Sequence, residues 1–150
     1  MKKAPDGFHF HSNGGGLVAN TAHVDGNAQV YGDARVYGEA WVSGDARVYG
    51  DARVYGDARV SGNAWVSGNA WVYGIARVSG DAWVSSPLYI QGTKHALTNS
   101  RHGYISIGCH ENTFEYWQKH YKAIGRAEGY TTEEIEQYGL FIQMFVKIGR

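Results

Sequence analysis

The sequence predicts a mainly β protein, in which a parallel β-helix of about four triangular coils is followed by a small α+β cap with two C-terminal helices. The evidence is three residue types that keep one six-residue period. Valine recurs from Val18 to Val84, alanine lies two residues before each valine from Ala22 to Ala82, and glycine lies two residues after from Gly26 to Gly80. So strict a period is typical of a solenoid, in which each repeat buries its apolar face by stacking on its neighbours.

The residues before the repeat, 1 to 17, are predicted to form an N-terminal cap or arm. They end in the flexible connector Ser12-Asn-Gly-Gly-Gly16. Upstream of it, His9 and His11 alternate with two phenylalanines that are expected to cover the open first coil. On a strand the two imidazoles would point the same way, as a candidate metal pair. Two imidazoles alone are too few ligands, so no metal site is predicted.

The repeat itself, residues 18 to 92, has the unit V-x-G-[DN]-A-x, as in Val48 to Arg53. In a strand, Ala-Arg-Val-Tyr alternates inward small or apolar side chains with outward polar or aromatic ones. The following Gly-Asp or Gly-Asn is a corner, because glycine adopts positive φ without a Cβ clash and Asp and Asn tolerate turns. A helix fits poorly, since six residues do not match its turn and each interior glycine would cost about 1 kcal/mol. Three hexapeptides therefore make one coil of eighteen residues.

This pattern resembles the bacterial hexapeptide-repeat family, whose members form left-handed parallel β-helices. The resemblance covers roughly half of the chain, from residue 18 to residue 90. It implies left-handed coils, which are an exception to the usual right-handed crossover between parallel strands. It also implies assembly into homotrimers.

The outward side chains fall into three faces, because residues eighteen positions apart are expected to stack at about 4.8 Å, the spacing of neighbouring strands. Arginine and tryptophan precede the valines, and tyrosine or serine follow them. The predicted ligand-binding or partner-binding face combines both kinds, namely Arg35, Tyr37, Arg53, Tyr55, Trp71 and Tyr73. The predicted oligomer interface is the face with the smallest side chains, namely Ser43, Ser61 and Ser79.

Two interpretations of these outward columns stay open. Stacked Arg–Trp and Tyr–Tyr neighbours stabilise a ladder through cation–π and offset aromatic contacts, each worth about 0.5–1.5 kcal/mol. Alternatively, the columns form a contact surface, because aromatic residues and arginine are enriched at binding hot spots.

The C-terminal segment, residues 93 to 150, is predicted to be the α+β cap. The repeat decays at Ser86-Pro87, and Lys94 falls on an inward position where a charge is not tolerated. Gly103 to Ile107 is predicted to be a strand, with residues 89–90 and 96–97 as its partners.

Two helices are expected to complete the cap. Asn112 with Glu115 resembles a capping pair for a helix that ends near Arg126, and the capping box Thr131 to Glu134 opens a helix that ends near Ile148. The single cysteine, Cys109, is expected to pack as a small hydrophobic residue. The apolar side chains of the two helices should form the core of the cap: Phe114, Trp117, Tyr121, Ile124, Ile135, Tyr138, Phe141, Ile142, Phe145, Val146 and Ile148.

A second resemblance concerns this cap alone. It rests on Ile90 to Lys94, Thr98, Gly103 to Cys109 and Thr113 to Trp117. These residues look like the C-terminal segment of uncharacterised small proteins of phages and prophages, often behind β-helical repeats. The resemblance implies a viral or mobile-element protein and brings no assigned chemistry.

Charge and composition restrict the partners and the compartment. Fourteen basic and fourteen acidic side chains cancel, so the charge indicates neither a nucleic-acid footprint nor a membrane surface. The basic start at Lys2 and Lys3 is followed by no apolar signal region, and no later stretch approaches a membrane span. One cysteine cannot form an internal disulfide, which fits a reducing cytosol. We therefore expect a cytoplasmic protein.

Catalysis has few candidate residues. The family's acyltransferases use a histidine near a cleft between subunits as general base, and its carbonic anhydrases use three histidines on zinc. The only histidine within the repeat is His23, which disfavours the zinc site. Acyl transfer would need His23 or a histidine that flanks the repeat as its general base. The histidines of the cap are scattered, and the glycines obey the corner rule rather than a phosphate-binding pattern. No cofactor is predicted.

The favoured function is that of a non-enzymatic binding protein of phage or prophage type that assembles through its β-helix. It could be an inhibitor or scaffold that binds a host protein. It could also sequester a small anionic, planar ligand such as a signalling nucleotide, with arginine supplying charge and aromatic rings supplying stacking. The alternative is an acyltransferase that uses acyl-CoA. Expected partners are further copies of the chain in a homotrimer and a host protein or small anionic ligand.

Overall fold

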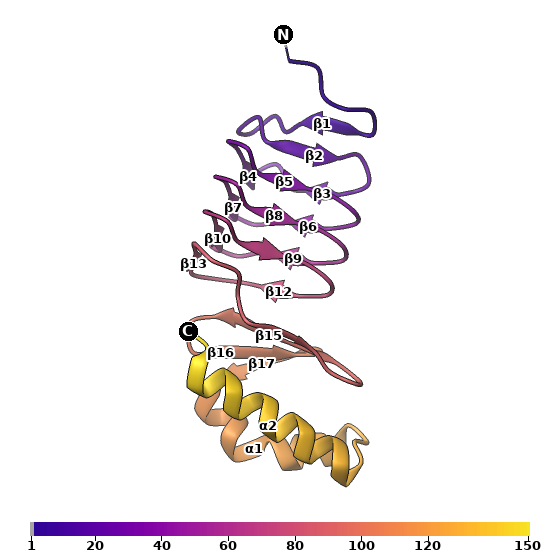
Figure 1. The fold of residues 1–150 in the computed structure, drawn as a ribbon, viewed down its shortest axis with the longest axis vertical. Helices are drawn as coiled ribbons and strands as arrows, with labels where there is room; N and C mark the ends of the chain where they lie inside the picture. The colour runs from indigo at the N-terminus through magenta and orange to yellow at the C-terminus, as the bar shows by residue number, and fades with distance from the viewer. Residues whose placement is uncertain (1) are drawn as a thin grey trace. The chain divides into compact units, whose positions relative to one another are not determined.

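The computed structural model describes residues 2–150, and it divides the chain into two compact units, Met1–Pro87 and Leu88–Arg150 (Figure 1). Met1, which belongs to the predicted arm, lies outside the described residues. The division comes before the boundary at residue 92 that the sequence indicated. The reason is that Tyr89–Gln91 (β14) pairs with Ala96–Arg101 (β15) of the second unit rather than continuing the coil.

The first unit is a β-solenoid of about four turns, as predicted, and its rungs stack in Figure 1. Its short strands form three sheets, and within the coil all pairs are parallel. One sheet contains β1 (Phe8–Phe10), β2 (Leu17–Ala19), β5 (Arg35–Val36), β8 (Arg53–Val54) and β11 (Trp71–Val72). A second contains β4 (Gln29–Val30), β7 (Arg47–Val48), β10 (Trp65–Val66) and β13 (Ala82–Trp83). The third contains β3 (His23–Val24), β6 (Trp41–Val42), β9 (Arg59–Val60) and β12 (Arg77–Val78).

The interior of the coil consists of the alanine and valine columns. Every repeat valine from Val30 to Val78 and every repeat alanine from Ala28 to Ala76 exposes at most 1% of its surface. Backbone groups bond from each coil to the next; the amide of Arg53, for example, donates to the carbonyl of Ala70 at 2.9 Å. The apolar columns are therefore dry while the backbone stays hydrogen-bonded.

The corners require glycine for two separate reasons. Gly38 has φ of 66°, in the left-handed region that side chains disfavour. In addition, a Cβ at Gly38 would lie 2.9 Å from the amide nitrogen of Gly56 in the next coil. The corner therefore allows adjacent backbones to approach at a distance that a side chain would prevent.

The last repeat departs from the six-residue register, and the prediction that Val84 points inward is wrong. Val66 pairs with Trp83 rather than with Val84, so Trp83 is 2% exposed and Val84 is 59% exposed. The positive φ of this corner, 64°, lies at Asp81 rather than at Gly80. The amide of Trp65 donates to the Asp81 carbonyl at 2.8 Å, where the repeat would use that of Ala82, so the strand begins one residue early. The larger apolar side chain takes the inward position, and its indole Nε1 donates to the carbonyl of Gly80 at 2.9 Å.

The N-terminal arm joins the coil by antiparallel pairing of β1 with β2. His9 and His11 do not form a metal pair. The Nδ1 atom of His9 lies 2.8 Å from Asn20 Oδ1, whereas His11 is buried, with Nε2 3.1 Å from the carbonyl oxygen of Ala28. The expected covering by the phenylalanines is only partial, since Phe10 is 40% exposed and it is His11 that turns inward.

The second unit is a four-stranded antiparallel sheet with two helices. The sheet order is β14, β15, β16 (Tyr104–Ile107) and β17 (His110–Thr113), followed by α1 (Phe114–Ala127) and α2 (Thr132–Ile148). The predicted strand is present as β16 and pairs with β15, as expected, whereas the other predicted partner, β14, pairs with β15 and not with β16. Strand β17 was not predicted, because His-Glu-Asn-Thr has no apolar alternation.

That extra strand changes the start of the first helix. Thr113, not Asn112, caps α1, since its hydroxyl accepts from the Tyr116 amide at 3.1 Å while Asn112 pairs within β17. Glu115, the predicted capping partner, accepts instead from Lys119 at 2.8 Å. The predicted capping box at the start of α2, formed by Thr131 and Glu134, is confirmed.

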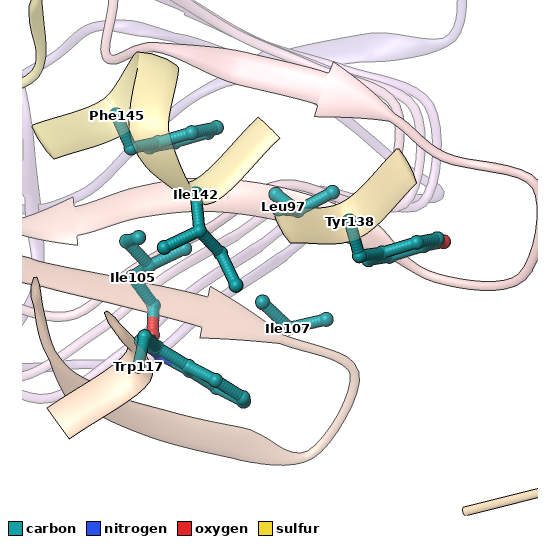
Figure 2. Close-up of a cluster of buried hydrophobic side chains, with 7 residues drawn as sticks. All are labelled: Leu97, Ile105, Ile107, Trp117, Tyr138, Ile142 and Phe145. Atoms are coloured by element: carbon teal, nitrogen blue, oxygen red, sulfur yellow. The ribbon is translucent and has the colours of Figure 1, made fainter. Parts of the chain in front are cut away.

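The core of this unit lies between helices and sheet (Figure 2). Most predicted members are buried or packed against it, but Ile148 is 61% exposed, since it lies at the last residue of α2. Cys109 is also exposed, because Gly108-Cys109 forms the turn between β16 and β17. The seven buried side chains are Leu97, Ile105, Ile107, Trp117, Tyr138, Ile142 and Phe145.

Candidate functional site

The structure brings the six residues of the predicted binding face onto one sheet. Strands β5, β8 and β11 are neighbours, with Arg35 opposite Arg53 and Arg53 opposite Trp71. Each strand is followed by an outward tyrosine. We call this surface the arginine–tyrosine face, and it consists of Arg35, Tyr37, Arg53, Tyr55, Trp71 and Tyr73.

Aromatic contacts order this face. The ring of Tyr55 stacks on Tyr37 at 4.8 Å between centroids and on Tyr73 at 5.5 Å, with interplanar angles of 2° and 13°. Tyr55 also meets Trp71 edge-on at 6.2 Å, and the Arg53 guanidinium lies 5.2 Å from the centroid of the same indole. Each such contact is worth about 0.5–1.5 kcal/mol, so the side chains are held in position before any partner arrives.

The surroundings of Tyr55 keep its hydroxyl protonated. Partial burial raises the pKa of Tyr55 above its ordinary value, and the neighbouring Tyr37 and Tyr73 raise it further, against the opposing charge of Arg53. Tyr55 therefore offers a neutral hydroxyl group that can donate a hydrogen bond.

The second sheet has a similar but shorter ladder. The guanidinium of Arg47 lies 4.8 Å from the centroid of Trp65, and Tyr31 stacks on Tyr49 at 4.9 Å. The column then continues with Ser67, which is only 3% exposed. Stacking alone therefore does not distinguish the two sheets; the arginine–tyrosine face differs by its third tyrosine.

The third sheet carries the predicted oligomer interface together with His23. Ser43, Ser61 and Ser79, which we call the serine face, follow β6, β9 and β12 and are half-buried. His23 is exposed at the start of the same sheet, with its ring 4.5 Å from that of Trp41.

A hollow of about 500 Å³ adjoins His23 on that sheet. The carboxylates of Glu39 and Asp57 line it, together with Arg59. The predicted interface and the predicted general base therefore share one face of the coil.

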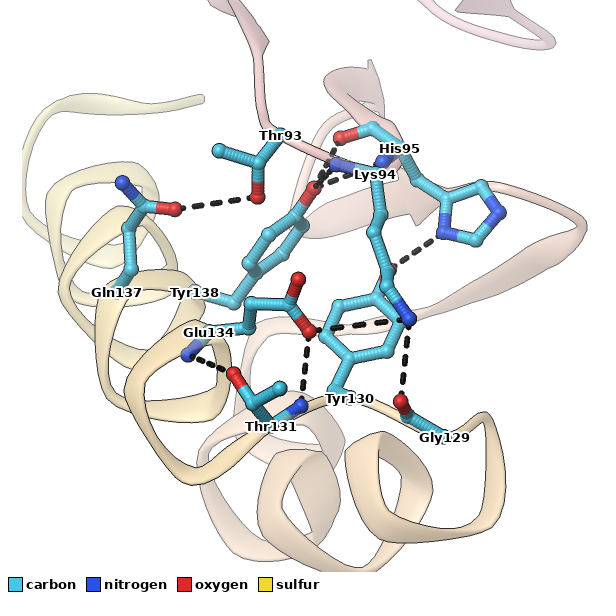
Figure 3. A network of polar contacts seen from close by, with 9 residues as sticks. All are labelled: Thr93, Lys94, His95, Gly129, Tyr130, Thr131, Glu134, Gln137 and Tyr138. Atoms are coloured by element: carbon cyan, nitrogen blue, oxygen red, sulfur yellow. Dashed lines mark hydrogen bonds and ion pairs between the residues drawn. The ribbon is translucent and has the colours of Figure 1, made fainter.

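The cap unit holds a polar cluster that sequence reasoning missed (Figure 3). The Tyr138 hydroxyl accepts from the amides of Lys94 and His95 at 3.0 and 2.8 Å and donates to the His95 carbonyl at 2.7 Å. The His95 ring nitrogen Nδ1 lies 2.5 Å from the Tyr130 hydroxyl, and Lys94 Nζ donates to the Gly129 carbonyl at 3.1 Å. Because these partners are distant in sequence, no local sequence pattern predicts the cluster.

The cluster ties the segment before β15 to the start of α2. Lys94 Nζ also lies 3.7 Å from the carboxylate of Glu134. This ion pair stabilises the positive charge of Lys94, which an inward position of the coil would not tolerate. Burial and the neighbouring Tyr138 raise the pKa of Tyr130 above its ordinary value. We call these contacts of Lys94, His95, Tyr130, Glu134 and Tyr138 the clamp, in which the hydroxyl of Tyr130 is neutral.

A small cavity of about 50 Å³ lies beside this cluster. Trp117, Tyr121 and Ile135 supply apolar walls, and Cys109 and His110 also line it. His110 Nε2 lies 3.1 Å from a carboxylate oxygen of Glu128. Within residues 2–150, no three histidine, cysteine or acidic side chains are grouped so that they could hold a metal ion.

Comparison with known proteins bears on the coil alone. The family described as YdcK Beta solenoid repeat matches residues 28–44, 46–58, 52–68 and 58–74. No curated protein and no solved structure matches the chain. Among the described residues, no helix has the length and apolar character needed to cross a bilayer. The starts of the matches differ by six residues or by one eighteen-residue coil, in agreement with the observed register. The chain therefore carries β-solenoid repeats similar to those of the YdcK family.

Proposed function

We propose that this is a non-enzymatic binding protein that offers its arginine–tyrosine face to a ligand or partner. The observation that supports this is the continuous column of three stacked tyrosines beside Arg53 and Trp71. Arginine, tyrosine and tryptophan are the residues most enriched at binding hot spots. Because the coil and the stacking already hold the side chains, little conformational entropy is lost on binding.

Assembly into a homotrimer through the serine face is a second part of the proposal. Small side chains at Ser43, Ser61 and Ser79 would let neighbouring coils approach closely. The hexapeptide pattern supports threefold assembly of left-handed coils. A cyclic trimer would also repeat the arginine–tyrosine face around its axis.

The partner that we propose is a host protein or a small anionic ligand in the cytoplasm of a bacterium. The resemblance of the cap segment to phage and prophage proteins supports a host-interaction role. The guanidinium groups of Arg35, which is exposed, and of Arg53, which is partly exposed, support a partner that carries negative charge.

Native mass spectrometry of the protein purified from expressing cells tests this function. We expect a retained mass on the wild type and its loss from the double variant Arg53→Ala/Tyr55→Ala. The matched control is Arg47→Ala/Tyr49→Ala, which has the same local sequence and loses the same kinds of stacking contact on another sheet. Retention by the first double variant, or loss from both, would contradict the proposal.

Acyl transfer by His23 is the competing hypothesis. It predicts turnover of acetyl-CoA with an amine or alcohol acceptor, reduced about 10²–10⁴-fold by His23→Ala. We expect no turnover by the wild type. Turnover that disappears in the His23 variant would overturn our choice.

A further inference from the structure

A groove runs along one edge of the arginine–tyrosine face, between the N-terminal arm and the coil. Its volume is about 520 Å³. Lys2 and Lys3 line it from the arm, and Arg35 and Arg53 line it from β5 and β8. Residues far apart in sequence thus bring four cationic side chains to one concave site.

The path of the arm explains how the lysines reach this site. The amide of Phe8 donates to the Pro5 carbonyl at 3.0 Å, which closes a turn just after the lysines. The amide of Asn20 donates to the carbonyl of Gly7 at 2.8 Å, and β1 then pairs with β2 next to β5. The segment that carries the lysines is therefore tied to the edge of the arginine sheet.

The charge of the groove is not balanced by its own acidic residues. Asp33 and Asp51 are the two carboxylates that line it, so the four cations leave an excess of two positive charges in a chain of zero net charge. No ion pair within the described residues engages Lys2, Lys3, Arg35 or Arg53. Four cationic groups around one hollow match a ligand with several adjacent negative charges better than one with a single charge.

We propose that this groove binds the diphosphate or polyphosphate group of a small phosphorylated ligand, of which a nucleoside diphosphate is an example. The remainder of such a ligand would lie on the arginine–tyrosine face, so the inference rests on the function proposed above. The two carboxylates disfavour an extended phosphate backbone, because they would face its negative charges along the same edge. The occupant is therefore a compact anion.

Titration calorimetry with inorganic pyrophosphate at low salt tests the site. We expect binding of one pyrophosphate per chain, weakened at least about tenfold by Lys2→Ala/Lys3→Ala and by Arg53→Ala. Added salt should weaken it as well. The matched control is Arg47→Ala, which also removes an arginine stacked on a tryptophan but lies on another sheet, and it should bind like the wild type. Equal melting temperatures of Arg53→Ala and Arg47→Ala would show that folding does not cause the difference.

Absence of pyrophosphate binding to the wild type at millimolar concentration would overturn the inference. Equal loss of binding in Arg47→Ala would overturn it as well, and so would binding of inorganic orthophosphate as tight as that of pyrophosphate. Tyr55→Ala separates this inference from the proposed function, because Tyr55 does not line the groove. We expect that variant to keep pyrophosphate binding while it loses the mass retained from cells. If the retained mass depends on Tyr55 but pyrophosphate does not bind, the groove inference alone fails.

Discussion

At the scale of residues, each repeat position has one environment that follows from the strand period. Val54 is fully buried, whereas its neighbours Arg53 and Tyr55 are partly exposed. These alternations could be predicted from the sequence because strand geometry alone sends neighbouring side chains to opposite sides.

The register predicts unequal effects of two adjacent substitutions. Val54→Asp would bury a carboxylate without a partner and should lower the free energy of unfolding by about 3 kcal/mol or more. Arg53→Ala should lower it by less than about 1 kcal/mol. Urea unfolding of the two variants measures the difference, and equal midpoints would contradict the register.

The corner glycines predict a second inequality. Gly38→Ala forces a side chain into the left-handed region and against Gly56, so we expect a loss of at least about 1–2 kcal/mol. Gly26 occupies the equivalent repeat position, but an added Cβ would meet no atom within 4 Å there. Gly26→Ala is therefore the control, and thermal denaturation should show a clearly smaller effect.

At the scale of elements, the last strand of the coil could not be predicted from the repeat. The pattern continues unbroken through Ala82 and Val84, so nothing local indicates that Trp83 takes the valine position. At the end of the coil Trp83 takes the inward position, because an indole buries more apolar surface than an isopropyl group. The cap helices were predictable from their capping box and apolar stripe, whereas the clamp of Lys94 and Tyr138 joins residues too distant for any local signal.

The shifted strand predicts which residue stabilises the end of the coil. Trp83→Ala should cost about 3–5 kcal/mol, because it empties a buried site. Val84→Ala should change stability by less than about 0.5 kcal/mol, because the side chain is exposed. Chemical denaturation of both variants tests whether Trp83 or Val84 points inward. A larger effect of the Val84 substitution would contradict the shifted strand and support an unbroken six-residue period.

The clamp predicts a loss of stability in alkali. The pKa of Tyr130 is raised in the folded protein above the value of about 10 expected in the unfolded chain. Folding therefore favours the neutral hydroxyl, and this contribution is complete below about pH 10 and declines as the pH rises further.

Tyr130→Phe should remove that pH dependence. Its stability relative to wild type should be lower at about pH 8, where the hydrogen bond to His95 is lost, and the gap should narrow at about pH 10.5. Urea midpoints at both values test this. A gap that widens with pH would contradict the raised pKa.

At the scale of the whole molecule, the three sheets of the coil present different surfaces. Every outward residue up to Tyr73 could be assigned to its sheet from the sequence, because residues eighteen positions apart lie next to each other in one sheet. It could not place Lys2 and Lys3 beside Arg35 and Arg53, since the arm has no repeat and its course depends on the turn at Pro5 and on pairing with β2.

The serine face predicts the response of the assembly to one added charge. Ser61→Arg should weaken a trimer at micromolar concentration through steric and charge conflict. Asn69→Arg adds the same charge at an exposed corner and should leave the assembly intact. Sedimentation velocity measures both, and a wild type that sediments as a monomer would rule out the trimer.

Hydroxyl-radical footprinting of the tyrosines tests the binding face most directly. Protein that carries the ligand retained from cells would be compared with the same protein after the ligand has been removed. We predict slower oxidation of Tyr37, Tyr55 and Tyr73 when the ligand is bound, and unchanged oxidation of Tyr31 and Tyr49, which are stacked in the same way on another sheet. Protection of Tyr31 and Tyr49 instead, or protection confined to the tyrosines of the cap, would contradict the assignment of binding to the arginine–tyrosine face.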